Sequence, residues 1–384
     1  MNILWISKIT DREYWRTTQL ELSKSLRKRG NKVILVMAKN FGENKPVEDD
    51  TIYLPILPHY ILSGLIFGLA LFFYFPLMVR KEKIDVIMID GTSVWLPFVV
   101  PLKLFKVPLV IDVRDLAIEK KTSVFFDFSL FLSKYIADGL TTITLELREV
   151  LREKYCLCDK KIGIWSSGVS LENFNGGCSS NSFHGEKTSN FTLLHHGSYG
   201  GDRGIENLIL AIGKLDEHIR RRVKLLLVGI PVEHQKGFLR LCEKVGVEEQ
   251  VNILPIVDYE KIPFYIQMSD VGVVPLPSDK TWCQVSAPLK TLEYLAMGKP
   301  IIATGIPFHR SIFEKGNCGI LVDANTPETL AEAITSLYKK SREKIKAMGE
   351  IGREIVEKHY SWDNMAFKVE RFLKDILQGY QNEK

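Results

Sequence analysis

Short apolar runs alternate with longer segments in which apolar residues recur every three or four positions along this 384-residue chain. Apolar runs of four to eight residues indicate strands, and the longer period indicates helices. Strands that alternate with helices are typical of an α/β protein whose parallel sheets are covered on both faces. We expect strands in these ranges: 3–6, 32–37, 84–89, 107–116, 162–165, 191–195, 223–228, 251–254 and 271–274.

The alternation is interrupted once, over residues 176–190, which are rich in Gly, Ser, Asn and Lys and contain little to bury. Such a composition indicates a linker, and the chain length suits two domains. We predict a first domain over 1–175, a second over 191–358, and a terminal helix over 359–384.

Residues 60–79 contain no charge and are long enough to span a bilayer. Predicted strands of one sheet precede and follow them, so a crossing would split that sheet. A helix that is apolar all round must bury more than one stripe, which leaves three destinations open: the domain core, a partner subunit or the membrane interface. Arg80, Lys81 and Lys83 follow and suit anionic head groups, so we expect a membrane contact over 60–83.

Composition adds mild constraints. A 46% hydrophobic and 25% charged content is ordinary for a globular protein, and a net charge of +5 does not favour a nucleic-acid partner. The six cysteines are scattered, and Cys156-x-Cys158 has no second pair to complete a zinc site. Free thiols in a reducing cytoplasm are therefore expected. The first residues lack the basic flank of a signal peptide and fit a strand.

A short helix followed by a buried strand is predicted over residues 286–304. Ser286 can cap this helix and Pro288 suits its first turn. Lys290 and Glu293 are three apart and project together. The N–H groups of the first turn and Lys290 can bind phosphate, and Glu293 can accept two hydrogen bonds from a ribose diol. The alternative is a solvated Lys/Glu pair on a surface helix.

The sequence PLKTLEYLAMGKPIIA over 288–303 resembles the donor-binding helix of the retaining family-4-like glycosyltransferases of the GT-B fold. The resemblance implies that Glu293 binds the nucleotide ribose and that the helix start faces the diphosphate. Most members carry a second glutamate eight residues earlier, which contacts the transferred hexose, and this position is Val285. Gln284 and Ser286 are then the polar candidates for binding sugar hydroxyls.

A Gly-rich turn, Gly197 to Gly204, separates the strand over 191–195 from a helix. Such turns cradle phosphate with backbone N–H groups. Family members typically place two cations in this turn; Ser198 replaces the first and Arg203 stands at the second. We predict a diphosphate site formed by Gly197, Ser198, Arg203 and Lys290, in which Lys290 compensates for the missing cation.

In the first domain, Arg114 and Asp115 follow the strand that begins near residue 107. Ligands of open α/β sheets bind at the carboxyl ends of strands, so both are predicted as catalytic residues. The segment Arg114-Asp115-Leu116 resembles a variant seen in family members that act on amino-deoxy sugars. The alternative is a pair that fixes a loop.

The resemblance covers nearly the whole chain and implies a GT-B fold, with two Rossmann-like domains whose parallel sheets face each other across a cleft. It also implies that the terminal helix returns to the first domain. The expected activity is transfer of a sugar, with retention, from a UDP- or GDP-sugar to a glycan or polyprenyl-linked acceptor. Such a reaction serves polysaccharide, glycolipid or glycoprotein glycan synthesis, expected at the cytoplasmic face of the cell membrane.

No Asp-x-Asp string occurs, so neither a metal nor a cofactor beyond the donor is expected to be obligatory. Two alternatives stay open. One is a nucleotide-sugar epimerase or hydrolase of the same fold, which would need no acceptor. The other is a non-catalytic, membrane-bound partner subunit, which would bind the donor without turnover.

Overall fold

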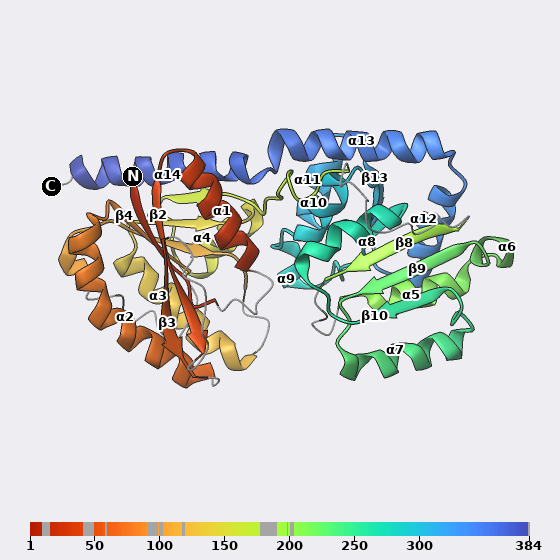
Figure 1. The fold of residues 1–384 in the computed structure, drawn as a ribbon, viewed down its shortest axis with the longest axis horizontal. Coiled ribbons are helices and arrows are strands. Elements are labelled where there is room, and N and C mark those ends of the chain that lie inside the picture. Colours follow the sequence, from red (N-terminus) through yellow and green to blue (C-terminus); the bar gives the residue numbers. More distant parts are fainter. Residues whose placement is uncertain are drawn as a thin grey trace. The chain divides into compact units, whose positions relative to one another are not determined.

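The computed structural model describes residues 1–9, 16–40, 50–57, 60–90, 99, 103–116, 120–176, 190–197, 199 and 203–382. These form two compact units (Figure 1). Unit 1 comprises Met1–Ser167, Val285–Ala287 and Trp362–Lys384, and unit 2 comprises Gly168–Gln284 and Pro288–Ser361. The units divide after Ser167, and most of the linker predicted over 176–190 lies outside the described residues.

Unit 1 contains a seven-stranded parallel sheet in the order β3-β2-β1-β4-β5-β6-β7. Its strands are β1 (Asn2–Ile6), β2 (Lys32–Asn40), β3 (Thr51–Ile56), β4 (Val86–Asp90), β5 (Leu109–Val113), β6 (Gly139–Thr142) and β7 (Ile162–Ile164). Its helices are α1 (Arg16–Lys28), α2 (Tyr60–Glu82), α3 (Lys120–Ile136), α4 (Leu145–Lys154) and α14 (Trp362–Asn382). The parallel α/β architecture is the one that the sequence predicts.

Strand β3 is not among the predicted strands, and its sequence contains Pro55. Proline cannot donate a hydrogen bond to a neighbouring strand and is confined to edge strands. β3 is an edge strand that pairs with β2 only, with Pro55 opposite Lys39. The sheet therefore tolerates a residue that argues against a strand when the sequence is read alone.

The helices of unit 1 cover opposite faces of the sheet. α1 connects β1 to β2, whereas α2 connects β3 to β4 and α3 connects β5 to β6 in the reverse direction along the sheet. Parallel connections are right-handed, so α2 and α3 share one face. α1 packs against α14 on the other face.

Helix α2 has one side buried in the core of unit 1 and one side exposed. One stripe is buried in the unit 1 core: Ser63, Phe67, Leu71, Phe75 and Met78. The opposite side is exposed over its length, with Phe73 at 73% and Leu77 at 64%. By length and composition the segment Leu62–Glu82 could cross a membrane, with a mean hydropathy of 2.1 and 39% of its most apolar window buried. It is therefore a core helix with a second, uncovered apolar side.

The terminal helix belongs to unit 1 and begins at Trp362 instead of residue 359. Gly163 on β7 allows close approach, since an added Cβ would lie 2.6 Å from the ring of Phe372. Arg29, just after α1, forms a salt bridge of 2.6 Å with Glu370. Packing and charge together attach the end of the chain to the first sheet.

Unit 2 contains a six-stranded parallel sheet in the order β10-β9-β8-β11-β12-β13. Its strands are β8 (Phe191–His196), β9 (Val223–Val228), β10 (Val251–Leu254), β11 (Val271–Val274), β12 (Ile301–Thr304) and β13 (Gly319–Val322). Its helices are α5 (Ile205–Lys214), α6 (Glu217–Arg220), α7 (Val232–Val245), η2 (Tyr259–Lys261), α8 (Ile262–Met268), α9 (Thr281–Gln284), α10 (Leu289–Ala296), α11 (Pro307–Phe313), α12 (Pro327–Tyr338) and α13 (Arg342–His359).

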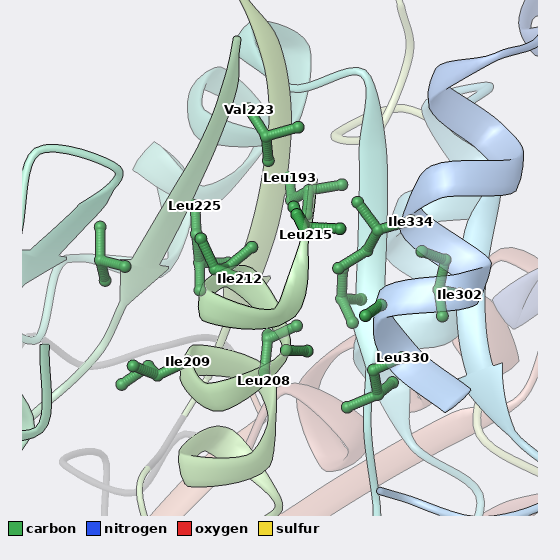
Figure 2. Close-up of a cluster of buried hydrophobic side chains, with 14 of the residues drawn as sticks. Leu193, Leu208, Ile209, Ile212, Leu215, Val223, Leu225, Ile302, Leu330 and Ile334 are labelled. Atoms are coloured by element: carbon green, nitrogen blue, oxygen red, sulfur yellow. The ribbon is translucent and has the colours of Figure 1, made fainter. Parts of the chain in front are cut away.

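A fully apolar cluster supports this second sheet. Figure 2 shows side chains from α5 and α12 meeting those of the strands, among them Leu208, Ile212, Leu330 and Leu225. All four are 0% exposed. Burying a side chain of this size stabilises a fold by about 1.5–3 kcal/mol, so the cluster provides a rigid base for the loops at the carboxyl ends of the strands.

Candidate functional site

The candidate site of unit 2 lies where the strand order reverses. β8 has β9 on one side and β11 on the other, and connections leave this point in both directions. In open α/β sheets ligands bind at the carboxyl ends of the strands beside such a point. Here β8 ends in His195 and His196, and the Gly-rich turn that starts at Gly197 follows.

Helix α10 is fixed to this point by Tyr294. The Tyr294 hydroxyl donates to the carbonyl of Leu194 at 2.9 Å and accepts from the backbone N–H of His196 at 3.0 Å. Its ring packs on Gly272 of β11, where an added Cβ would lie 2.2 Å from the ring. The helix that carries Lys290 and Glu293 is thus held against the end of β8.

The start of α10 differs from the predicted one. Pro288 is the residue before the helix and Leu289 is its first member, so Ser286 does not cap it. Proline offers no side-chain acceptor, and the first-turn N–H groups have no side-chain cap from Pro288. Uncapped N–H groups at a helix start favour an anion. At the other end, Gly298 has φ +65°, the left-handed conformation that the sequence predicts there.

Lys290 projects from the first turn of α10 toward the Gly-rich turn. Gly197 has φ +113°, a backbone conformation that favours glycine, and a Cβ added there would lie 3.1 Å from Lys290 Nζ, so the turn passes close to this ammonium. Burial and the neighbouring Arg203 lower the pKa of Lys290 to about 7, although Glu293 opposes this. Among the described residues, no carboxylate forms an ion pair with Nζ. In the described part of the site, the positive charge of Lys290 therefore has no ion-pair partner.

Arg203 supplies a second cation beside Lys290. Its guanidinium lies 4.6 Å from the ring centre of Trp282 on α9, and its buried Nε has no hydrogen-bond partner in the described part of the chain. A guanidinium held flat on an aromatic ring keeps its edge for a planar or tetrahedral anion. The two cations and the Gly-rich turn together suit a diphosphate.

Glu293 lies one turn further along α10 and is 3% exposed. The Tyr259 hydroxyl donates to its Oε1 at 2.7 Å, and the Nε2 atom of His196 lies 3.4 Å from Oε2. Burial raises the pKa of Glu293 to about 7, against the effects of Tyr259 and Lys290. Burial and Lys290 lower the pKa of His196 far below its ordinary value, so this imidazole is neutral. Oε2 can therefore accept hydrogen bonds from a diol.

The structure brings together Gly197, Arg203, Lys290 and Glu293 of the predicted site. Ser198 lies outside the described residues. Sugar binding by Gln284 and Ser286 stays a prediction: the Gln284 amide donates to the Ser278 carbonyl, and Ser286 lies in a three-residue segment grouped with unit 1.

Val285 holds the position of the family's hexose-binding glutamate, and its side chain is 2% exposed. Its carbonyl accepts a hydrogen bond of 2.9 Å from Thr144, within unit 1. An apolar, buried side chain cannot bind a sugar hydroxyl, so Val285 does not replace the glutamate that contacts the hexose in other family members.

In unit 1, Arg114 and Asp115 lie in different surroundings. Arg114 stacks 3.9 Å from the ring centre of Trp165 and pairs with Asp112 at 3.7 Å. Asp115 is exposed, and its Oδ1 accepts from the N–H of Leu116. Burial raises the pKa of Asp112 to about 7; Arg114 opposes this, and Asp90, at the paired position of β4, adds to it. The catalytic roles of Arg114 and Asp115 stay predictions.

Three residues of the unit 2 site were not among the predicted ones: Trp282, Tyr259 and His195. Each is distant in sequence from the residue that it contacts, so no local spacing indicates the contact. His195 offered one signal, as a polar residue at the end of an otherwise apolar strand. No group of three or more His, Cys, Asp or Glu suited to a metal ion occurs among the described residues.

The comparisons with known proteins agree with this geometry. Residues 180–355 match the family model "Glycosyl transferases group 1", and residues 17–173 match "Glycosyltransferase Family 4". Sucrose-phosphate synthase from Thermosynechococcus elongatus superimposes with a TM-score of 0.78 at 18% identity, over 98% of this chain and 99% of that one. The architecture is that of the GT-B fold. The chain belongs to the group 1 glycosyltransferases.

The chain spans less than half the length of the curated relatives described next. D-inositol 3-phosphate glycosyltransferase from Corynebacterium urealyticum is 29% identical over 40% of this chain and 35% of the relative. A GDP-mannose-dependent α-(1-6)-phosphatidylinositol monomannoside mannosyltransferase from Mycobacterium tuberculosis is 24% identical over 45% of this chain and 44% of the relative. A solved structure of Anabaena HepE with UDP has a TM-score of 0.69 at 14% identity, with 98% and 100% of the two chains covered.

Proposed function

We propose that unit 2 binds a nucleoside-diphosphate sugar and that the enzyme transfers its sugar, with retention of configuration, to a glycan or polyprenyl-linked acceptor. The observation that carries this proposal is the pair of cations, Lys290 and Arg203, beside Gly197 at the start of the Gly-rich turn, neither of them in an ion pair with a carboxylate of the described residues. A dianionic diphosphate would neutralise both. Glu293, one helical turn deeper, is placed for the adjoining ribose.

The same groups would serve the chemistry. As the glycosidic bond breaks, negative charge develops on the leaving diphosphate, and fixed cations lower the energy of that state. Lys290, Arg203 and the uncapped start of α10 supply this charge from the protein itself. We assign the acceptor-side roles to Arg114 and Asp115, as the segment following β5 suggests.

The comparisons suggest which donors to test. Anabaena HepE is solved with UDP, and the mycobacterial relative is named for GDP-mannose. A panel of UDP- and GDP-sugars, free diphosphates and free nucleosides should be tested by thermal shift. A ligand at a hundred times its Kd stabilises by about 2.7 kcal/mol, so the correct diphosphate should raise Tm and its nucleoside should not.

Product analysis separates the alternatives. With donor and a polyprenyl-diphosphate sugar, a new glycoside whose anomeric configuration matches that of the donor supports the proposal. Donor consumption without acceptor would indicate the epimerase or hydrolase. Donor binding without turnover in any acceptor mixture would indicate the non-catalytic subunit, which the loss of the glutamate at Val285 favours.

We also propose that the enzyme is a peripheral protein of the cytoplasmic membrane face, which its uncovered apolar helices contact. Exposed apolar residues form continuous rows on α2 and α3, which share one face of the sheet. They are Leu62, Leu65, Leu69, Phe72, Phe73, Tyr74 and Leu77 on α2 and Val124, Phe128, Phe131 and Tyr135 on α3. Leu104, between β4 and β5, is 81% exposed beside Phe105, which packs on Phe75 of α2.

The basic residues at the end of α2 favour contact of this face with an anionic membrane surface. Arg80, Lys81 and Lys83 are exposed, and each basic residue near an anionic surface contributes about 1 kcal/mol. The mycobacterial relative is named for an acceptor that contains phosphatidylinositol. A lipid-linked acceptor would require the enzyme to work at such a surface.

Vesicle sedimentation tests the membrane proposal. The protein should pellet with phosphatidylglycerol vesicles and be partly released at high salt. The double variant Phe73→Ser, Leu77→Ser should stay in the supernatant and keep donor binding. Leu239→Ser, a similarly exposed residue on α7 of unit 2, is the control and should pellet normally. A parent protein that ignores vesicles would refute the proposal.

A further inference from the structure

His195 lies at the end of β8 with its side chain 1% exposed. Its Nδ1 lies 2.9 Å from the carbonyl oxygen of Val273 on β11, and its Nε2 lies 3.5 Å from Lys290 Nζ. A carbonyl oxygen only accepts hydrogen bonds, so Nδ1 must carry the proton. In a neutral imidazole Nε2 then has the lone pair. His195 therefore offers Lys290 an acceptor inside the cationic site.

Among the described residues, this acceptor makes the hydrogen-bond contact of Nζ, at 3.5 Å. Ammonium groups carry three donors, and no carboxylate of the described residues forms an ion pair with this one. Burial and the charge of Lys290 lower the pKa of His195 well below its ordinary value, which keeps the ring neutral. A protonated ring would direct an N–H at the ammonium and repel it.

We propose that His195 is a positioning residue of the diphosphate site, because its Nε2 lone pair holds the Lys290 ammonium in place and keeps it protonated. This inference rests on the proposed donor site and adds a residue that no diphosphate contact would reveal. His195 does not touch the donor in this account. It acts on the donor through Lys290.

Burial and two charged groups act on the pKa of Lys290. Arg203, from the turn before α5, disfavours the ammonium, as does the low-dielectric surrounding, whereas Glu293 on α10 favours it. His196, the neighbour of His195 on β8, is neutral. A hydrogen bond to the charged form favours that form. Without His195, Lys290 should lose its proton at lower pH, and the diphosphate would then meet a neutral amine.

Two substitutions of His195, by Asn and by Gln, distinguish positioning of Lys290 from structural support. His195→Asn can keep the contact with Val273, but its shorter side chain does not reach Lys290. His195→Gln places an amide oxygen near the position of Nε2. His309 gives a matched control: it is 0% exposed, its Nδ1 lies 2.6 Å from the Thr304 carbonyl, and its Nε2 faces the Thr291 hydroxyl at 2.9 Å instead of a lysine.

The measurement is the Kd of UDP-glucose and of GDP-mannose from pH 5.5 to pH 8, because the diphosphate of each ligand stays dianionic and its base stays neutral over this range. The affinity of the parent should fall above about pH 7. His195→Asn should bind within about twofold of the parent at pH 5.5 and about tenfold more weakly at pH 8, which corresponds to a pKa lower by one unit for Lys290. His195→Gln and His309→Asn should follow the parent.

Three results would overturn the inference. One is a loss in His195→Asn by the same factor at pH 5.5 and pH 8, which indicates a structural role. The second is a His195→Asn profile identical to that of the parent. The third is a His309→Asn profile that shifts as much as that of His195→Asn. If neither ligand binds the parent at any pH, the proposed donor site itself is wrong, and the inference falls with it.

Discussion

Replacing Lys290 by methionine should make unit 2 more stable while it abolishes diphosphate binding. Methionine keeps the length and apolar stem of the side chain and removes the charge. In the free protein the ammonium is partly buried near Arg203 without an ion-pair partner among the described residues. Such a charge costs folding energy that the donor would offset on binding.

The magnitude follows from the pKa of Lys290. Each unit of pKa is worth about 1.4 kcal/mol, so a fall from 10.5 to about 7 sets an upper limit of about 5 kcal/mol. Lys290 keeps some access to water, which screens the charge, and we expect a gain of about 1–3 kcal/mol. For a domain of this size each kcal/mol raises Tm by about 2–4 °C.

The gain should depend on pH. Between pH 7 and pH 10.5 the unfolded chain keeps the Lys290 proton and the folded protein has lost it, so the stability of the parent rises with pH in this window. The advantage of Lys290→Met is therefore largest at pH 7 and below and shrinks toward pH 10. The assay is thermal unfolding at pH 6, 7, 8 and 9, together with the Kd of the nucleoside diphosphate that stabilises the parent.

Lys346→Met serves as the control, because Lys346 is exposed on α13. Its loss should change neither the Tm nor the Kd of the nucleoside diphosphate. A loss of roughly 1.5–3 kcal/mol in diphosphate affinity is expected for Lys290→Met, as for other charge-assisted contacts. A variant that is less stable than the parent and still binds the diphosphate would refute the view that Lys290 is an uncompensated cation of the donor site.

Substitutions of Arg203, Glu293 and Arg114 test the other roles assigned to single side chains. Arg203→Ala should weaken donor and nucleoside diphosphate about 10- to 100-fold and leave the nucleoside unaffected, by calorimetry; equal losses for both would remove Arg203 from the diphosphate. Glu293→Gln should lower the affinity of a ribonucleotide more than that of its 2′-deoxy analogue; equal losses would contradict the ribose assignment. Arg114→Met leaves Asp112 without its cation and raises its pKa further. Because the folded acid then keeps its proton to higher pH than the unfolded one, the contribution of Asp112 to stability should continue to fall above pH 7, where it levels off in the parent; a stability difference between variant and parent that does not change with pH above 7, measured by chemical denaturation, would refute this.

The sequence predicts the site where the relevant residues lie within one helix or one turn. Lys290 and Glu293 are three apart, so their shared direction follows from helical geometry alone. Gly298 ends α10 in the left-handed conformation for the same local reason. Arg203 is predicted because its turn stands between a strand and a helix.

The contacts that tune these groups come from distant segments and could not be predicted. Tyr259 reaches Glu293 from η2, 34 positions away, and Trp282 reaches Arg203 from α9. The cap predicted at Ser286 is wrong because the helix begins later, at Leu289. β3 is not among the predicted strands; it contains Pro55, which a strand accommodates at a sheet edge, and edge position is a property of the whole sheet.

The most direct test of the donor site is a crystal structure with the nucleoside diphosphate that stabilises the protein. We predict phosphate oxygens within hydrogen-bond distance of Lys290 Nζ and of the Arg203 guanidinium, with the diphosphate against Gly197. Both ribose hydroxyls should contact the Glu293 carboxylate. A nucleotide bound elsewhere, or one whose ribose lies against Lys290 with the diphosphate directed away from Arg203, would contradict it.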